Sequence, residues 1–154
     1  MRIAISADEL TGIAESLDVA LRERKHEPIT HGALNPGERE REDWAWASAA
    51  AARDVAEGRA DQAIVCCWTG TGASIAANKV GGIRAALCTD AKTAEGARHW
   101  NDANVLALSL RTTSAAELAE ILDAWFGAKP SDKADDQANV AHLGELERRL
   151  ADVE

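Results

Sequence analysis

Five short apolar runs recur along this chain, and segments with apolar residues at helical spacing lie between them. The runs are residues 3–7, 27–31, 63–67, 83–88 and 104–108, of which the second is the weakest. Short runs that alternate with helical segments are typical of βα units, in which crossover helices join parallel strands. The pattern therefore predicts a three-layer α/β/α fold around a five-stranded parallel sheet. With 154 residues, the chain is long enough for one such domain with a buried core.

Capping residues predict where the intervening helices begin and end. Asp43 is expected to cap a helix that stops near Gly58, and Ser114 is expected to cap a later one. One more helix is expected to begin at Ser74, and another to end near Trp100. The helical positions expected to face the core are Ile13, Leu17, Leu21, Trp44, Ala47, Ala51, Val55, Leu118, Ile121, Leu122 and Trp125.

The C-terminal segment differs from the rest of the chain. Residues 129–137 are polar, and an apolar stripe at helical spacing follows, formed by Val140, Leu143, Leu146 and Leu150. We therefore divide the chain into an α/β domain over residues 1–128 and a polar linker with an extra C-terminal helix over residues 129–154. A helix of this kind packs either on its own domain or on a partner.

Composition excludes several classes of protein. The formal net charge of −9 at pH 7 argues against non-specific nucleic-acid binding, which needs a cationic surface. No apolar run approaches the roughly 18 residues that a membrane helix requires, and the apolar start is too short for a signal peptide. The cysteines Cys66, Cys67 and Cys88 do not have the spacing of a disulfide framework. We expect a soluble protein of the reducing cytoplasm.

A loop with two glycines follows the third apolar run. Residues 67–79 read Cys-Trp-Thr-Gly-Thr-Gly-Ala-Ser-Ile-Ala-Ala-Asn-Lys. In open α/β sheets ligands bind where strands end, and a helix N-terminus there favours a phosphate or an oxyanion. An ordinary strand–turn–helix with a buried cysteine explains the same residues equally well. The loop lacks the third glycine of a dinucleotide fingerprint and the Gly-Lys-Ser/Thr of a P-loop. The histidines and cysteines lack zinc-site spacing, so neither a cofactor nor a metal is expected.

Three blocks of sequence resemble one enzyme family. Residues 67–79 resemble the Cys-Gly-Thr-Gly-x-Gly-x-Ser-Ile-Ala-Ala-Asn-Lys signature of B-type ribose-5-phosphate isomerases and of galactose-6-phosphate isomerases, except that Trp68 replaces a glycine. Residues 82–88 resemble the family's Gly-Ile-Arg-Ala-Ala-Leu-Cys strand, and residues 101–106 its Asn-Asp-Ala-Asn-Val-Leu segment. The resemblance runs in register from Ile3 to about Phe126. It implies a Rossmann-like sheet, aldose–ketose isomerisation without metal or cofactor, and a homodimer whose active sites form between subunits.

The resemblance also implies which residues carry the reaction. Isomerisation through an enediol needs a base over the carbon and hydrogen-bond donors around the developing oxyanion. Cys67 matches the family's base, and a helix N-terminus suits a thiolate. Thr69 and the backbone N–H groups of the loop match the donors. The loop residues implied in substrate binding are Gly70, Thr71, Gly72 and Ser74.

Three further residues match the family's substrate contacts. Asp8 matches an aspartate that contacts sugar hydroxyls, Asn101 an asparagine beside the substrate, and Arg111 an arginine that helps to bind phosphate. The residues alone leave simpler interpretations open. Asp8 is also suited to cap the next helix, and Arg111 to be a solvated surface charge.

Several positions depart from the family pattern. Glu9 stands where the family has a histidine, and Trp100 stands where it has the histidine that assists ring opening. His99 is one position earlier, which on a helix turns its side chain by about 100°. The family's phosphate-binding arginines align with residues 134–139, which carry two aspartates and no arginine. Because acids repel a phosphate dianion, we expect ribose 5-phosphate to bind more weakly than a neutral or differently placed anionic sugar.

Two functions follow from these similarities and departures. The first is an aldose–ketose isomerase of a sugar phosphate, of the ribose-5-phosphate or galactose-6-phosphate type, or of a related sugar. In it, Trp68 and Trp100 stack on the sugar, and Glu9 and His99 line the site. The alternative is a non-catalytic sugar-binding homologue, or a partner subunit of an active paralogue, in which the tryptophans fill the pocket. Of the other cations, Arg84 is interpreted as structural and Lys79 as solvent-facing. Arg39 and Arg41 belong to a charged loop that either faces water, as such runs usually do, or folds over the pocket.

Overall fold

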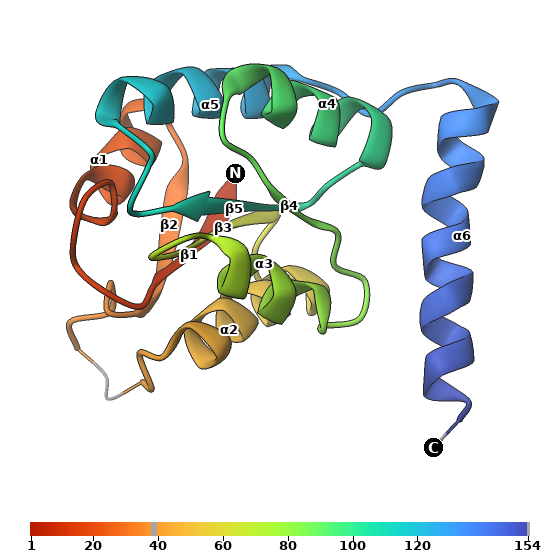
Figure 1. The fold of residues 1–154 in the computed structure, drawn as a ribbon, viewed down its shortest axis with the longest axis horizontal. Helices are drawn as coiled ribbons and strands as arrows, with labels where there is room; N and C mark the ends of the chain where they lie inside the picture. Colours follow the sequence, from red (N-terminus) through yellow and green to blue (C-terminus); the bar gives the residue numbers. More distant parts are fainter. Residues whose placement is uncertain (38–39, 154) are drawn as a thin grey trace.

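The computed structural model describes residues 1–37 and 40–153, and a five-stranded parallel sheet forms its centre, in the order β2-β1-β3-β5-β4. The strands are β1 (Arg2–Ala7), β2 (Glu27–Gly32), β3 (Gln62–Cys67), β4 (Ala85–Leu87) and β5 (Val105–Ser109). Helices α1 (Ala14–Glu23), α4 (Ala91–Asn101) and α5 (Ala115–Gly127) cover one face of the sheet. Helices α2 (Trp44–Ala56) and α3 (Thr71–Asn78) cover the other face (Figure 1). This arrangement confirms the predicted α/β/α fold.

Both faces of the sheet are buried, which explains why the strands read as uninterrupted apolar runs. Alternate residues of each strand face opposite layers. The face under α1, α4 and α5 carries the larger side chains, including Ile3, Ile5, Ile64, Leu106 and Leu108. The face under α2 and α3 carries smaller ones, including Ala4, Ala63, Val65, Val105 and Ala107. Small side chains on both the strands and these two helices let α2 and α3 approach the sheet closely.

Helix α3 begins at Thr71, three residues before the predicted start at Ser74. Gly70 immediately before it has a φ of 77°, in the left-handed region that favours glycine. A β-carbon at this position would lie 2.6 Å from Leu87 Cδ1 and 2.9 Å from the backbone carbonyl carbon of Leu108. Glycine therefore lets the chain turn from β3 directly into α3.

Strand β4 is shorter than the predicted residues 83–88. The N–H group of Arg84, just before β4, donates to the side-chain oxygen of Asn104, and that of Ala85, the first residue of β4, donates to the side-chain oxygen of Asn78. Only residues 85–87 pair with β5. The side chains of two asparagines thus take over hydrogen bonds at this edge of the sheet.

The structure corrects two expectations about α2. Asp43 is the N-cap residue, but its side chain makes no capping hydrogen bond; its carboxylate pairs with Arg41 over 2.6 Å. Trp44, predicted to face the core, is 44% exposed. Ala47 and Ala51 on the same helix are buried as predicted.

The C-terminal helices differ in how firmly they join the domain. Ser114 caps α5 as predicted: its hydroxyl accepts the N–H of Glu117, whose carboxylate accepts the N–H of Ser114. Helix α6 (Ala134–Ala151) begins inside the segment predicted as a polar linker and stands apart from the α/β layers (Figure 1). Acidic residues in its first turn favour a helix N-terminus.

The apolar stripe of α6 is only partly covered. None of the described residues of this helix is buried, and the exposed fractions are 43% for Leu143, 43% for Leu146 and 76% for Leu150. Within residues 1–37 and 40–153, no helix is both long and apolar enough to cross a membrane.

Candidate functional site

The carboxyl ends of β1 and β3 lie side by side near the centre of the sheet. From β1 the chain passes to β2 on one side, and it later returns to β3 on the other side. Ala7 pairs with Cys66 in the ladder between the two strands, which brings Asp8 and Cys67 to the same edge. Open α/β sheets bind ligands in the crevice at such a switch point. The structure therefore brings together the predicted base and the predicted sugar contact.

Cys67 faces α3 and lies at its N-terminus. Its Sγ accepts a hydrogen bond from the backbone N–H of Ala73 over 3.4 Å. The first N–H groups of a helix have no carbonyl partner within the helix, so the sulfur pairs with a donor that is otherwise free. The partial positive charge of the helix N-terminus therefore lies beside Cys67.

The neighbouring Cys66 points to the opposite face of the sheet. It is packed in the core under α1, α4 and α5, whereas Cys67 belongs to the cluster under α2 and α3. Burial raises the pKa of the Cys66 thiol well above its usual range, and the nearby Cys67 and Asp8 add to the rise. Of these two adjacent thiols, only Cys67 lies at the edge where ligands bind.

The loop after Cys67 is fixed through its backbone while its side chains stay open. The carbonyl oxygen of Trp68 accepts hydrogen bonds from the backbone N–H of Arg111 and from the hydroxyl of Ser109, each over 2.9 Å. The Trp68 side chain itself is 52% exposed. The hydroxyls of Thr69 and Thr71 lie 2.7 Å apart and are exposed. Polar groups and an aromatic face therefore surround the mouth of the site.

Asp8 does not cap the helix that follows it, because the N-cap position of α1 is Ile13. Its Oδ1 is buried and has no hydrogen-bond partner within the described part of the chain. Burial raises the pKa of Asp8; a backbone hydrogen bond works against this rise, and the charges of Glu9 and Asp43 add to it. A buried acceptor without a partner is suited to a substrate hydroxyl.

Helix α2 contributes to this site, which the sequence patterns did not predict. The ring of Trp44 lies over Gly72, where a β-carbon would come within 2.9 Å of the Trp44 Cδ2 and Cε3 atoms. Asp43 is close enough for its charge to act on Asp8. The sequence does contain a signal for this contact: the second glycine of the loop is needed because the Trp44 ring packs against it.

Two other predicted site residues lie nearby. The exposed Glu9 follows Asp8 in the chain, and Ser74 donates its N–H to the Gly70 carbonyl.

The cations near the predicted site have different surroundings. Arg111 is exposed, and its guanidinium makes no hydrogen bond or ion pair with another described residue. Arg41 pairs with Asp43, and its guanidinium lies 3.4 Å from the centroid of the Trp46 ring. The guanidinium of Arg84 binds Asp102, as expected for a structural residue. Lys79 is exposed, and Arg39 lies outside the described residues.

The remaining predicted site residues lie at the other end of the strands, away from the carboxyl ends where Cys67 is found. His99, Trp100 and Asn101 end α4, which runs back from the carboxyl end of β4. His99 Nδ1 is 2.9 Å from the Lys129 carbonyl oxygen, which can only accept, so in this contact Nδ1 is the nitrogen that donates. Within one chain these three residues are therefore not part of the crevice at Cys67.

Trp100 lines a separate cavity between α4 and α6. Its volume is about 310 Å³, and Asp102, Asp136 and Gln137 also line it. Asp136 accepts a hydrogen bond from the Ser131 hydroxyl over 2.6 Å. The cavity thus combines an aromatic wall with acidic groups. In the described ranges, no three His, Cys, Asp or Glu side chains are grouped so as to hold a metal ion.

Comparisons with known proteins agree on one family. The model of the family described as "Ribose/Galactose Isomerase" matches residues 3–143. The chain is 40% identical over 129 residues to ribose-5-phosphate isomerase B of Escherichia coli, and the match covers 83% of this chain and 85% of that protein. It is 33% identical over 137 residues to D-erythrulose-4-phosphate isomerase of Pectobacterium atrosepticum, with 84% of each chain covered.

A solved structure is similar over almost the whole chain. The ribose-5-phosphate isomerase B of Clostridium thermocellum superposes with a TM-score of 0.86 at 35% sequence identity. The match covers 97% of this chain and 99% of that one. The similarity therefore includes the C-terminal helix as well as the α/β layers.

Proposed function

The chain belongs to the ribose/galactose isomerase family, and from this premise we propose that it interconverts an aldose phosphate and a ketose phosphate, with Cys67 as the base. The observation that carries the proposal is the contact of Cys67 Sγ with the Ala73 N–H at the edge where β1 and β3 end. Relatives named for five-carbon and four-carbon sugar phosphates lie within the same family.

The proposed reaction moves one proton between adjacent carbons. The Cys67 thiolate removes a proton from the carbon next to the carbonyl, and the electron pair of that C–H bond moves to form an enediolate. The carbonyl oxygen becomes an oxyanion, and the loop hydroxyl of Thr69 and the N–H groups from Gly70 onward are the candidate donors to it. The hydroxyl proton on the adjacent oxygen passes to the former carbonyl oxygen, so that the new carbonyl forms there as the thiol returns its proton to the neighbouring carbon. Asp8 accepts a hydrogen bond from a sugar hydroxyl.

We further propose that the complete site contains residues from two copies of the chain. His99, Trp100 and Asn101 lie at the other end of the strands from Cys67, and the apolar stripe of α6 is half exposed. A homodimer supplies both the missing residues and a cover for the stripe. Mixing Cys67→Ala with Asn101→Ala protein tests this, because a mixed dimer regains one intact site. Activity that does not return after subunit exchange contradicts a shared site.

A substrate with an open carbon chain fits the departures of this sequence best. The resemblance gives ring opening to a histidine at the position that Trp100 occupies here. A tetrose 4-phosphate cannot close a five-membered ring, because its terminal oxygen carries the phosphate, so it needs no such histidine. A shorter sugar also leaves room for the Trp68 side chain. We therefore rank four-carbon sugar phosphates above ribose 5-phosphate as substrates.

Proton exchange in D₂O tests the proposed reaction directly. Erythrose 4-phosphate, ribose 5-phosphate and unphosphorylated sugars are incubated with the protein, and deuterium next to the carbonyl is measured. We expect exchange with the four-carbon phosphate, and its loss in Cys67→Ala. If no sugar gains deuterium, or if the variant exchanges equally well, the chain is not an isomerase of this mechanism.

A non-catalytic role is the second candidate, because Trp100 and the acidic cavity beside it replace groups that the resemblance assigns to ring opening and phosphate binding. Calorimetric titration with ribose 5-phosphate separates the two. We expect weak binding to the wild type and still weaker binding to Arg111→Ala. Tight binding that depends on Arg111 contradicts the expected discrimination against this sugar, and binding without proton exchange supports the non-catalytic role.

A further inference from the structure

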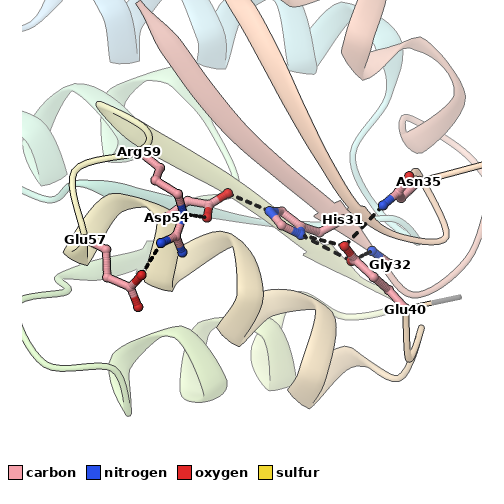
Figure 2. Close-up of polar contacts among 7 residues, drawn as sticks. All are labelled: His31, Gly32, Asn35, Glu40, Asp54, Glu57 and Arg59. Atoms are coloured by element: carbon pink, nitrogen blue, oxygen red, sulfur yellow. Dashed lines mark hydrogen bonds and ion pairs between the residues drawn. The ribbon is translucent and has the colours of Figure 1, made fainter. Parts of the chain in front are cut away.

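His31, at the end of β2, lies between two carboxylates (Figure 2). Its Nε2 is 2.6 Å from Asp54 Oδ2, on α2. Its Nδ1 is 3.2 Å from Glu40 Oε2, in the connection between β2 and α2. The His31 side chain is 14% exposed and that of Asp54 is 7% exposed, so solvent has little access to the pair. One ring therefore joins the connection to the helix that follows it.

Both carboxylates also accept hydrogen bonds from other donors, which shows that they act as acceptors in this cluster. Glu40 accepts hydrogen bonds from the Gly32 N–H and from the Asn35 amide. Burial tends to raise the pKa of Glu40, but the Gly32 N–H, the charge of His31 and the Asn35 amide together lower it. Asp54 accepts from Arg59 Nε over 2.7 Å. Both ring nitrogens face acceptors, so each of the two contacts is a hydrogen bond only when its ring nitrogen carries a proton.

The segment that His31 holds leads directly into the candidate site. Three residues after Glu40 comes Asp43, whose charge acts on Asp8. The next residue, Trp44, packs its ring against Gly72 in the first turn of α3. The position of residues 40–44 therefore sets the wall of the crevice on the side of α2.

We propose that His31 is a positioning residue: bonded to Glu40 and Asp54 at once, it holds residues 40–44 so that Trp44 stays against Gly72 beside the sugar. The proposal rests on the isomerase function above for its kinetic consequences.

Loss of the ring proton from His31 removes one of its two hydrogen bonds. Asp54 also pairs with Arg59, which in turn pairs with Glu57, and Glu40 accepts from two neutral donors (Figure 2). The contact to Glu40 is the longer of the two, 3.2 Å against 2.6 Å to Asp54, so the bond to Glu40 is the one that gives way. Ser6, the neighbour of His31 in β1, brings no charge.

Hydrogen exchange tests the positioning without any need for activity. Deuterium uptake of residues 40–44 is measured at one pH in wild type, His31→Gln and Glu40→Gln. We expect faster uptake in H31Q, because its amide cannot donate to both carboxylates. E40Q should stay near the wild type, because its amide can donate to the unprotonated nitrogen of a neutral ring. Asp18→Asn removes the exposed ion pair with Arg22 and serves as a control. Equal uptake in wild type and H31Q overturns the proposal.

Kinetics of the isomerase distinguish positioning from a general structural role. We expect KM of H31Q to rise about tenfold, as for the loss of one charge-assisted hydrogen bond, with kcat nearly unchanged. In the wild type, KM should rise with pH along the same curve as the His31 titration followed by NMR, and E40Q should abolish this coupling. A KM that is unchanged in H31Q, or that does not follow the His31 titration, overturns the proposal. If the wild type isomerises no sugar, the proposed function fails, and the exchange experiment still decides whether His31 holds the segment.

Discussion

Gly70→Ala is the substitution that most directly tests how the loop after Cys67 is built. Gly70 has a φ of 77° and lies against β5, with its missing β-carbon 2.9 Å from the Leu108 carbonyl carbon and 2.6 Å from Leu87 Cδ1. The left-handed backbone costs an alanine about 1–2 kcal/mol. The overlap with the rigid backbone of Leu108 adds about 1–3 kcal/mol. We therefore expect G70A to lose about 2–5 kcal/mol of unfolding free energy.

Two other glycines separate these contributions. Gly82 has a φ of 80°, but a β-carbon added there would meet no described atom within 4 Å, so Gly82→Ala should cost only the backbone part. Gly37 has neither a positive φ nor a described neighbour within 4 Å of such a carbon, so Gly37→Ala should be neutral or slightly stabilising. The difference between G70A and G82A thus measures the steric overlap at the loop alone.

Urea unfolding at one fixed protein concentration gives all three free energies. The concentration is fixed because association stabilises the folded chain. Unchanged m-values are needed for the comparison, since they indicate that the same surface is exposed on unfolding. If G70A and G82A lose the same free energy, the close approach of Gly70 to Leu108 does not constrain the loop, and the reasoning is wrong.

Three further predictions use the same unfolding assay. Trp125→Phe removes the Nε1 donor to Gln62 Oε1 (2.7 Å) and should cost about 1–2 kcal/mol; no loss would mean that water replaces the bond fully. Ser114→Ala removes the α5 cap and should cost about 1 kcal/mol, most of which Ser114→Asp should restore; an unaffected alanine variant contradicts the role of the cap. Because burial raises the pKa of Cys66 in the folded chain, its thiol stays protonated while the unfolded thiol ionises above pH about 8.5. Stability is therefore full below that pH and should fall above it by up to about 1.4 kcal/mol per pH unit for this thiol. Cys66→Ala should reduce the slope and leave the part due to Cys88, whose pKa is also raised by burial; an equal slope in both proteins refutes the assignment.

The fold could be predicted from the sequence because local patterns and tertiary packing agree. Strands buried on both faces have continuous apolar runs, and Ser114 followed by Glu117 marks a helix start without ambiguity. Predictions were wrong where side chains replaced backbone partners or where glycine changed the geometry. The asparagines that shorten β4 and the left-handed Gly70 that starts α3 early are both of this kind. Such contacts join residues distant in sequence, and periodicity does not report them.

The candidate site was predictable only in part for a similar reason. Asp8 and Cys67 end neighbouring strands, so their meeting follows from sheet topology. The contact of Trp44 with Gly72 depends on how closely α2 packs beside α3, which no local pattern contains. His31 was not singled out either, because its carboxylate partners lie 9 and 23 residues away in the chain.

The opposite orientation of the two adjacent cysteines has a consequence for oxidative damage. An oxidant that converts Cys67 to a sulfenic acid produces a group that is normally rescued by a second thiol nearby. Cys66 and Cys88 both lie in the core on the other side of the sheet, so neither can reach it while the strand is intact. Recovery of an oxidised Cys67 therefore depends on a small thiol that enters from solvent, and without one a second equivalent of the oxidant converts the sulfenic acid to irreversible sulfinic acid.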